Sequence, residues 1–246
     1  MKRITLILLS NLIVTCFVFA QEKERTPIGG RPDIKGDLFI EFGFNSLNNN
    51  PDELKRRFLP SRTFNIYYQH PINIGAENSG ITFNPGIGIG TDKLAFNDNK
   101  ALFNNPTIGP ESSQLLDISD VYGDNISISR NNVSTSFIEV PLEFRYHFNR
   151  NNYQKSMRLA IGGKVGYLLQ AQTKIAFSDS NGLDRQVKDR QSFGFNPLRY
   201  GVYGRFGFAG VNLWAYYGLN QVFQKEKGPF ATEATQINFG ISVALF

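Results

Sequence analysis

The sequence predicts an all-β fold: an eight-stranded antiparallel transmembrane β-barrel whose strands follow one another as an up-and-down meander. Three observations predict it. Apolar residues recur at every second position in eight separate segments, the connections between the segments are alternately long and short, and the polar side of the segments is rich in glycine and in charges of both signs. Alternation with period two is typical of strands with two unlike faces.

The alternation defines eight strand segments. In the fourth, for example, Ile138 and Val140 alternate with Glu139 and Pro141. The eight predicted strands cover residues 38–44, 64–70, 81–90, 138–147, 157–177, 198–208, 211–220 and 237–245. In the longest, the fifth, one face is predicted to hold Met157, Leu159, Ile161, Val165, Tyr167, Leu169, Ile175 and Phe177, and the other Arg158, Lys164, Gln170, Gln172 and Lys174.

The connections between the predicted strands alternate in length. The odd-numbered ones are long and cover Asn45–Arg62, Thr91–Ser136, Ser178–Pro197 and Gln221–Thr235. The even-numbered ones are shorter and cover His70–Gly80, Phe148–Lys155 and the pair Ala209–Gly210. Outer-membrane barrels have long outer loops and short periplasmic turns. We therefore expect an integral, multi-pass protein of the cell outer membrane with both chain ends in the periplasm.

One long connection carries a helix signal. Asn50 is a suitable N-cap and Pro51 suits the first helical position. The sequence therefore predicts a short helix over about residues 51–58.

A soluble β-sandwich is the alternative, because its strands alternate as well. A sandwich strand seldom runs as long as residues 157–177, and its polar face seldom carries so many glycines. In a narrow barrel the inward face must hold small or mutually neutralising side chains, and Gly, Glu, Arg and Lys meet that need. The barrel is the favoured interpretation.

The N-terminal residues are predicted to be a secretory signal peptide, residues 1–20. Lys2 and Arg3 precede an apolar run that ends at Ala20. The alternative, an N-terminal transmembrane anchor, suits less well because the run is interrupted and short for a span. Residues 21–36 would be a short periplasmic segment, and residues 37–246 the barrel domain. Cys16 lies inside the apolar run, so the mature chain would contain no cysteine and no disulfide.

Charge and motifs exclude several classes of function. Without Lys2 and Arg3, 24 of the 26 Lys+Arg remain against 21 Asp+Glu, an excess too small to indicate nucleic acid as a partner. The glycines of residues 86–90 lack the helix and spacing of a phosphate-binding loop. The aspartates at 117–124 and 179–184 lack calcium-loop spacing. We predict no catalytic, cofactor-binding or metal-binding residue, and no cofactor.

Two histidines bear on enzymatic function. Eight-stranded lipid A-modifying barrels use serine, histidine and a carboxylate near the outer leaflet. His70 and His147 end strands that run toward the periplasm, which is the wrong side for that chemistry. The sequence therefore predicts a protein that is not an enzyme.

Charged residues on the inward face form the main candidate site. Because an isolated buried ion costs several kcal/mol, such charges must pair. We predict that they form a structural network of ion pairs that fills the lumen. Its predicted members are Glu41, Glu139, Glu143, Arg145, Arg158, Lys164, Arg199 and Arg205. A conducting or catalytic role for these charges is the alternative.

Several segments resemble a known family. Residues 137–145 (FIEVPLEFR) resemble the "EVPL" strand of the PorT-like outer-membrane β-barrel proteins of Bacteroidota, and residues 162–169, 196–205 and 84–88 are similar to further family features. The resemblance covers nearly the whole mature chain and implies a barrel in the outer membrane. The family is named after a component linked to type IX secretion and gliding. One departure concerns Phe246, which stands out of phase with the apolar set that runs from Ile237 to Leu245.

The expected function is that of a non-enzymatic envelope component, structural or interacting, with a side-chain-filled lumen. The alternatives are an accessory role in type IX secretion or gliding, and a narrow selective channel. The expected partners are outer-membrane lipid, the barrel-assembly machinery during biogenesis, and envelope or secretion proteins.

Overall fold

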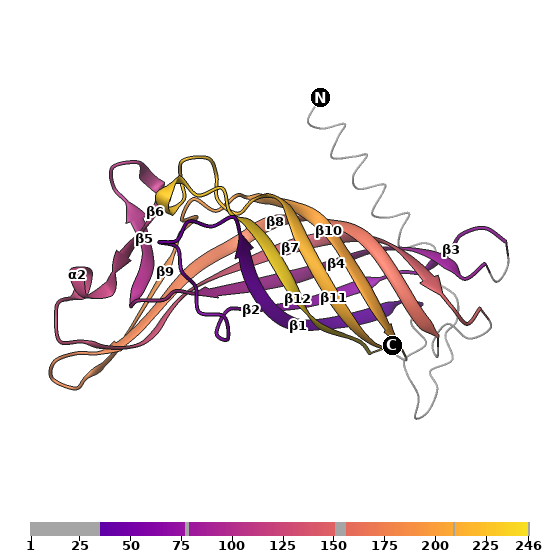
Figure 1. Cartoon of the computed structure of the whole chain (residues 1–246), viewed down its shortest axis with the longest axis horizontal. Helices are drawn as coiled ribbons and strands as arrows, with labels where there is room; N and C mark the ends of the chain where they lie inside the picture. Colours follow the sequence, from indigo (N-terminus) through magenta and orange to yellow (C-terminus); the bar gives the residue numbers. More distant parts are fainter. Residues whose placement is uncertain (1–34, 77–78, 151–155, 209, 246) are drawn as a thin grey trace, which may run out of the picture. The chain divides into compact units, whose positions relative to one another are not determined.

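Eight antiparallel strands close into a barrel in the computed structural model, which describes residues 35–76, 79–150, 156–208 and 210–245. The barrel strands are β1 (Asp37–Asn48), β2 (Arg62–Gln69), β4 (Ile81–Ala95), β7 (Ser127–His147), β8 (Met157–Ser178), β10 (Leu198–Phe208), β11 (Val211–Gln221) and β12 (Thr235–Ala244). Each pairs with the barrel strands before and after it (Figure 1). The predicted eight-stranded meander is confirmed. The predicted signal peptide, nearly all of the segment 21–36, and Phe246 lie outside the described residues.

The barrel closes where β12 pairs with β1. The ladder at this seam runs from Phe39 opposite Ala244 to Asn48 opposite Thr235. Gly43 and Gly240 face each other across it. A Cβ atom on Gly43 would lie 2.2 Å from the carbonyl oxygen of Phe239, so the backbones approach closely only because this residue has no side chain.

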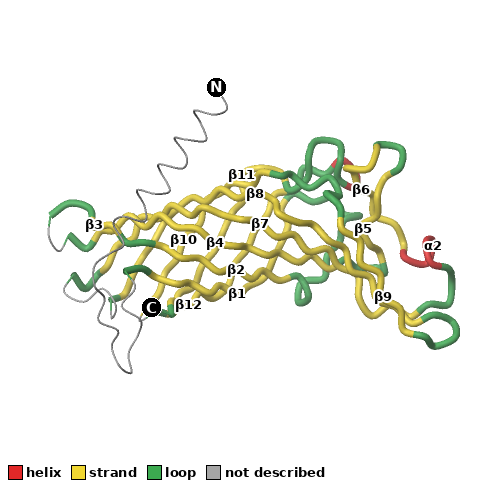
Figure 2. Tube along the Cα trace, turned by 180° about the vertical axis from the view of Figure 1, so that it is seen from behind, coloured by secondary structure: helices red, strands yellow, loops and turns green. Residues whose placement is uncertain are grey.

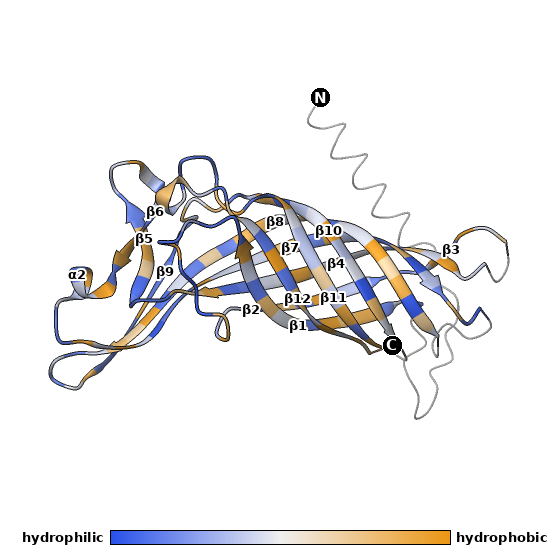
Figure 3. Cartoon of the chain, in the orientation of Figure 1, coloured by the Kyte–Doolittle hydropathy of each residue, from blue (hydrophilic) through white to orange (hydrophobic). Residues whose placement is uncertain are grey.

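The wall of the barrel turns apolar side chains outward and polar ones inward. Ile161 and Leu213 are 69% and 66% exposed on the outer face, whereas Glu139 and Glu143 are fully buried on the inner face. Orange and blue alternate along the strands in Figure 3 for this reason. Within the part of each strand that carries this pattern, the predicted facing of side chains is confirmed.

The two ends of the barrel differ. At one end, here called the turn end, the first and last barrel strands begin and finish, and β3 (Ile72–Asn73) pairs with β4. At the other, the loop end, β9 (Asp184–Arg190) extends the sheet from β8, and β5 (Lys100–Asn105) and β6 (Gly109–Asp117) form a separate hairpin (Figures 1 and 2). β5, β6 and β9 lie in segments that the sequence predicts to be connections.

Two short helices lie in the long connections: α2 (Ile118–Tyr122) and the 3-10 helix η1 (Pro229–Ala231). Neither these nor any other helix in the described part of the chain is long and apolar enough to cross a membrane.

A β-bulge in β8 overturns part of the predicted facing. Ser136 pairs with Gln170 and the next residue, Phe137, pairs with Leu168, so Leu169 is an extra residue on β8. An extra residue reverses the alternation beyond it. Ile175 and Phe177 are therefore buried at 2% and 5% exposure. They do not share the outer face of Leu159 and Val165, as the uninterrupted alternation had predicted.

The same bulge also turns the polar residues of β8 that follow Leu169 from the inner face to the outer face. Gln170, Gln172 and Lys174 were predicted on the face of Lys164. Beyond Leu169 they alternate with the buried residues Ala171, Thr173 and Ile175. They therefore lie on the outer side of the sheet.

The predicted helix over residues 51–58 is wrong. Those residues form turns, and Arg56 makes an isolated β-bridge with Phe96. Asn50 does not cap a helix, because its side-chain amide donates to the carbonyls of Pro51 and Leu54, each at 3.2 Å. Leu54 is 1% exposed in an apolar cluster. Burial of this side chain and the bridge to Phe96, just after β4, outweigh the helix-start signal.

Candidate functional site

Four of the predicted lumen charges form one cluster in the lower half of the barrel, toward the turn end. Arg205 donates to Glu41 at 2.7 Å and also pairs with Glu143. Arg145 donates to Glu143 at 2.8 Å and pairs with Asp37. The four side chains come from β1, β7 and β10, and the register of the barrel brings them together across the lumen. We call Glu41, Glu143, Arg145 and Arg205 the lower cluster.

Three further predicted residues form a second cluster closer to the loop end. Glu139 accepts from Arg199 at 2.8 Å and from Lys164 at 3.3 Å. Arg199 also pairs with Asp92, and the hydroxyl of Tyr67 donates to Glu139. We call Glu139, Lys164, Arg199 and Asp92 the upper cluster. All four side chains are at least nine-tenths buried, so their mutual pairing offsets much of the cost of removing them from water.

The last predicted member, Arg158, lies beside the lower cluster without an ion pair to it. Its guanidinium donates to Asn212 at 2.9 Å and lies over the ring of Phe39 at 5.6 Å. It forms no ion pair with any residue that the structure describes. Arg145 and Arg205 also stack on Phe39, at 5.2 and 4.4 Å. One aromatic ring thus supports three cations through its negative face.

Sequence reasoning missed two carboxylates of the lumen. Asp37 pairs with Arg145, and Asp92 pairs with Arg199. The sequence predicts Asp92 to lie in the connection Thr91–Ser136, because apolar residues cease to alternate after Ile89. Asp92 is two residues after Gly90, which faces inward as Asn84 does. Continuing the alternation along the strand would therefore have placed Asp92 in the lumen.

With Asp37 and Asp92 included, five acidic and five basic side chains face one another in the described lumen. They are Asp37, Glu41, Asp92, Glu139 and Glu143 against Arg145, Arg158, Lys164, Arg199 and Arg205. Their formal charges cancel, which is what a narrow interior of low dielectric requires.

Apolar side chains close the lumen at the loop end. We call this group the apolar plug; its buried members are Leu47, Leu54, Leu94, Phe96, Leu102, Leu115, Val133, Ala171, Phe193, Phe195, Phe223 and Ala234. Phe195 and Phe223 stack with their ring centroids 4.6 Å apart. Strands supply the inward-facing members and the long connections supply the others, so the plug ties the connections to the barrel.

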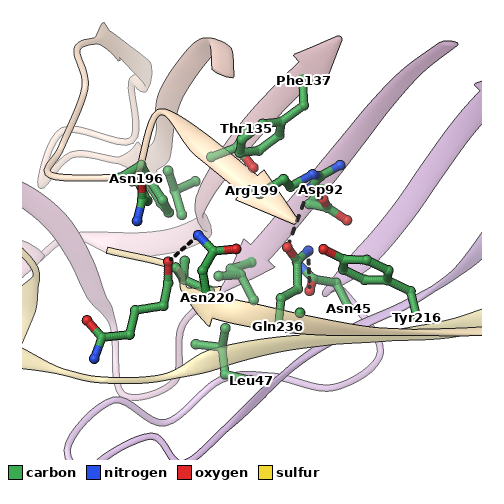
Figure 4. A pocket seen from close by; sticks show the side chains of 16 residues that line it. Asn45, Leu47, Asp92, Thr135, Phe137, Asn196, Arg199, Tyr216, Asn220 and Gln236 are labelled. Carbon is green, nitrogen blue, oxygen red and sulfur yellow. Dashed lines mark hydrogen bonds and ion pairs between the residues drawn. The ribbon is translucent and has the colours of Figure 1, made fainter. Parts of the chain in front are cut away.

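Two small hollows lie along this axis among the described residues. A cavity of about 30 Å³ lies between the upper cluster and the plug, lined by Arg199, Asp92 and Asn45 on one side and by Leu47 and Phe195 on the other. Figure 4 shows Gln236 bridging Arg199 and Asn45 at its wall, at 3.3 and 3.2 Å. A second hollow, of about 10 Å³, separates the two clusters. Such volumes have room for one or two waters at most.

Several titratable groups lie outside the two charge clusters. His70 is exposed at the end of β2 and His147 is buried at the end of β7, both at the turn end. Burial raises the pKa of Tyr122, which packs beside Phe177 in the loop region. Hydrogen bonds from Ser119 hold the pKa of Asp117 below its ordinary value. These groups do not converge on one pocket, and the described residues contain no group of three His, Cys, Asp or Glu able to hold a metal ion.

The comparison with protein families decides the assignment of the barrel. Residues 19–224 match the model of the outer membrane protein β-barrel domain. The chain belongs to this outer-membrane β-barrel family. It is therefore an integral barrel of the outer membrane.

Solved structures give only distant likenesses. The attachment invasion locus protein Ail of Yersinia pestis, solved with the heparin analogue sucrose octasulfate, is 12% identical with a TM-score of 0.35, over 86% of this chain and 100% of that one. A mutant porin of Rh. blastica is 12% identical with a TM-score of 0.20, over 85% and 99%. No curated protein matches the chain.

Proposed function

We propose that this protein is a non-conducting, non-enzymatic component of the outer membrane that presents its loop end as an interaction surface. One observation carries the proposal: the described lumen is blocked twice in series, by paired charges and then by the apolar plug. A narrow selective channel needs a continuous polar path, and the plug interrupts such a path with stacked aromatic rings. The position of both histidines at the turn end supports a role without catalysis.

Conductance of the purified chain in planar bilayers tests the closed lumen. We expect no unitary current. The double variant Phe195→Ala/Phe223→Ala is the matched comparison, because it thins the plug and leaves both charge clusters in place. It should also stay silent. A steady unitary current from the unmodified chain, with an ion selectivity that changes in Arg199→Gln, would establish a channel and overturn the proposal.

The loop end is proposed to face the outside of the cell. The long connections and the additional strands β5, β6 and β9 all lie at that end, as the outer loops of such barrels do. Protease added to whole cells should cut within the connection that contains β5 and β6 and spare the turn between β7 and β8. Cleavage confined to that turn would reverse the orientation.

A finer placement among the PorT-like proteins of Bacteroidota is part of the same proposal. It is supported by the segment Phe137–Arg145, which lies in the C-terminal half of β7 and supplies a carboxylate to each charge cluster. Envelope or secretion proteins would then be partners of the loop end, and the barrel-assembly machinery a partner during insertion. Affinity purification from native membranes tests this. Recovery of type IX secretion components would favour the accessory role, and a preparation that contains only assembly factors would remove it.

A further inference from the structure

The last part of the connection between β1 and β2 lies against the outer face of the barrel wall. The ring of Phe58 stacks on that of Phe44, with their centroids 4.7 Å apart, and Arg56 donates to the hydroxyl of Ser46. Phe44 and Ser46 both point outward from β1, because they alternate with its buried positions. In Figure 1 a turn of this connection, near the label β2, projects sideways from the wall. We call residues 58–60 (FLP) the apolar tip.

The apolar tip lies at the edge of the outward apolar band. Along β1 the outward residues change from apolar to polar between Phe44 and Ser46, and along β2 they change between Phe64 and Arg62. Phe58 stacks on the last apolar residue of the β1 series. Outer-membrane barrels carry aromatic girdles where the apolar band ends, at the boundary between hydrocarbon and headgroups. The ring of Phe58 therefore lies at the height of such a girdle.

Hydrogen bonds hold the residues on both sides of the tip in place. The amide of Arg57 donates to the carbonyl of Ala95 at 2.8 Å, and the amide of Asn97 donates to the carbonyl of Lys55 at 3.0 Å. The hydroxyl of Ser61 donates to the carbonyl of Arg57 at 2.6 Å and accepts from the amide of Ala95 at 3.1 Å. The position of the tip beside the wall is therefore fixed by the fold.

The apolar side chains of the tip remain uncovered in this position. Phe58 is 44% exposed and Leu59 is 66% exposed. Single exposed apolar residues are common on soluble surfaces, so exposure alone does not identify a partner. Continuity with the outward face does, because Phe58 lies between Phe44 of β1 and Phe239 of β12, whose ring centroid is 6.2 Å away. The tip thus continues the apolar band across the seam where the barrel closes.

Cations surround the apolar tip. Lys55 and Arg57 are exposed before it, Arg62 is exposed after it, and the guanidinium of Arg56 lies over the ring of Phe58 at 5.6 Å. None of these four cations forms an ion pair with a residue that the structure describes. Segments that lie in a membrane interface combine Lys and Arg with Phe and Leu in this way. The long cationic side chains can keep their charged ends among the headgroups.

We propose that the apolar tip is a lipid anchor, in which Phe58 and Leu59 enter the boundary between headgroups and hydrocarbon beside the β12–β1 seam. The partner is the lipid leaflet next to the loop end. The anchor goes beyond the proposed function, because it assigns this connection to lipid and not to a protein partner. It does not depend on which way the barrel faces in cells.

The test uses the full purified chain with Cys16→Ser, because Cys16 is the one cysteine of the sequence. A bimane fluorophore on Leu59→Cys reports contact with lipid in phosphatidylcholine vesicles, where some lipids carry a quenching nitroxide on the acyl chain near the headgroup. Leu183→Cys is the matched control, since Leu183 is 58% exposed in the turn between β8 and β9. Leu213→Cys is the reference on the outer face of β11, where Leu213 is 66% exposed.

We expect quenching at residue 59 to be within about twofold of that at residue 213 and at least about threefold stronger than that at residue 183. The heat-induced mobility shift on gels shows that each labelled variant is folded. Equal quenching at residues 59 and 183 would overturn the proposal, because the tip would then lie in water. Protection of residue 59 from aqueous iodide that appears only at a high ratio of protein to lipid would also overturn it, because a second copy of the chain would then cover the tip.

Discussion

The barrel and its loop end are built from the same strands with opposite arrangements of polar and apolar residues. In the membrane section, Glu139 and Lys164 face inward and Ile161 faces outward. Beyond Leu169, Ile175 and Phe177 face inward and Lys174 faces outward. Outer-membrane barrels carry an outward apolar band where hydrocarbon surrounds them, and such surroundings would account for the difference between the two sections. A single inserted residue converts β8 from one pattern to the other while its ladder with β7 continues.

The largest effect is expected from breaking the interior of the membrane section. Glu143→Ala removes the carboxylate shared by Arg145 and Arg205, which are 2% and 4% exposed. Loss of one partner of a buried ion pair costs about 3–5 kcal/mol. We expect the urea midpoint of the gel mobility shift to fall accordingly.

A surface pair provides the control for that change. Glu111→Ala removes an exposed partner of Lys227, and exposed pairs contribute only about 0–1 kcal/mol. A triple change of Glu143, Arg145 and Arg205 to apolar residues should recover part of the loss. Equal urea midpoints for Glu143→Ala and Glu111→Ala would show that the lower cluster does not stabilise the barrel.

A smaller loss of stability is expected when a charged residue is placed on the outer face of β8. The loss is expected only on the barrel side of the bulge at Leu169. Val165 and Gln172 both point outward from β8, below and above Leu169. Val165→Arg should cost about 2–4 kcal/mol, because an arginine near the bilayer midplane meets hydrocarbon. Gln172→Arg should be neutral because water already surrounds that site. Refolding yields into vesicles measure both. Similar yields for the two variants would mean that the apolar face does not contact lipid.

The smallest effect concerns the loop end alone. Asp117 accepts from the backbone and hydroxyl of Ser119 at 3.0 and 2.5 Å and caps α2. Asp117→Ala should cost about 1 kcal/mol of local stability. Because these hydrogen bonds lower the pKa of Asp117 in the folded state, its contribution is present above the ordinary value of about 4 and is lost as pH falls below it.

Hydrogen exchange of residues 118–122 between pH 6 and pH 3 measures this contribution. Asp117→Asn should keep the cap and remove the pH dependence. Exchange that quickens equally in Asp117→Asn at low pH would assign the effect to other carboxylates.

The alternation of inward and outward side chains along each strand explains which parts of this structure could be predicted from sequence. In the membrane section every outward residue must be apolar, so the alternation around Ile138 and Val140 identifies the strand and turns Glu139 inward. Beyond it, both faces tolerate polar residues, and the pattern weakens. The extensions of β4 and β7, with the added strands β5, β6 and β9, therefore lacked a clear signal.

Two further predictions were wrong because contacts between segments far apart in the sequence decide the structure there. Nothing in the composition of β8 marks Leu169 as an added residue, because the shift is defined by the pairing with β7. Residues 51–58 carry a local helix signal, but the burial of Leu54 and the bridge from Arg56 to Phe96 oppose it. Local sequence patterns do not report contacts that distant segments make.

The Gly43–Gly240 seam has a consequence for the order of folding. Phe39 and Ala244 pair across almost the entire described barrel sequence, so this contact has the highest contact order in the wall, and closing it carries the largest loop-closure entropy. β1 emerges first during export yet has no partner for one edge until β12 has been delivered. Its unpaired amides and carbonyls cannot enter hydrocarbon without a cost of several kcal/mol each. The chain must therefore remain bound to a temporary partner strand, or outside the bilayer core, until its last ten barrel residues arrive.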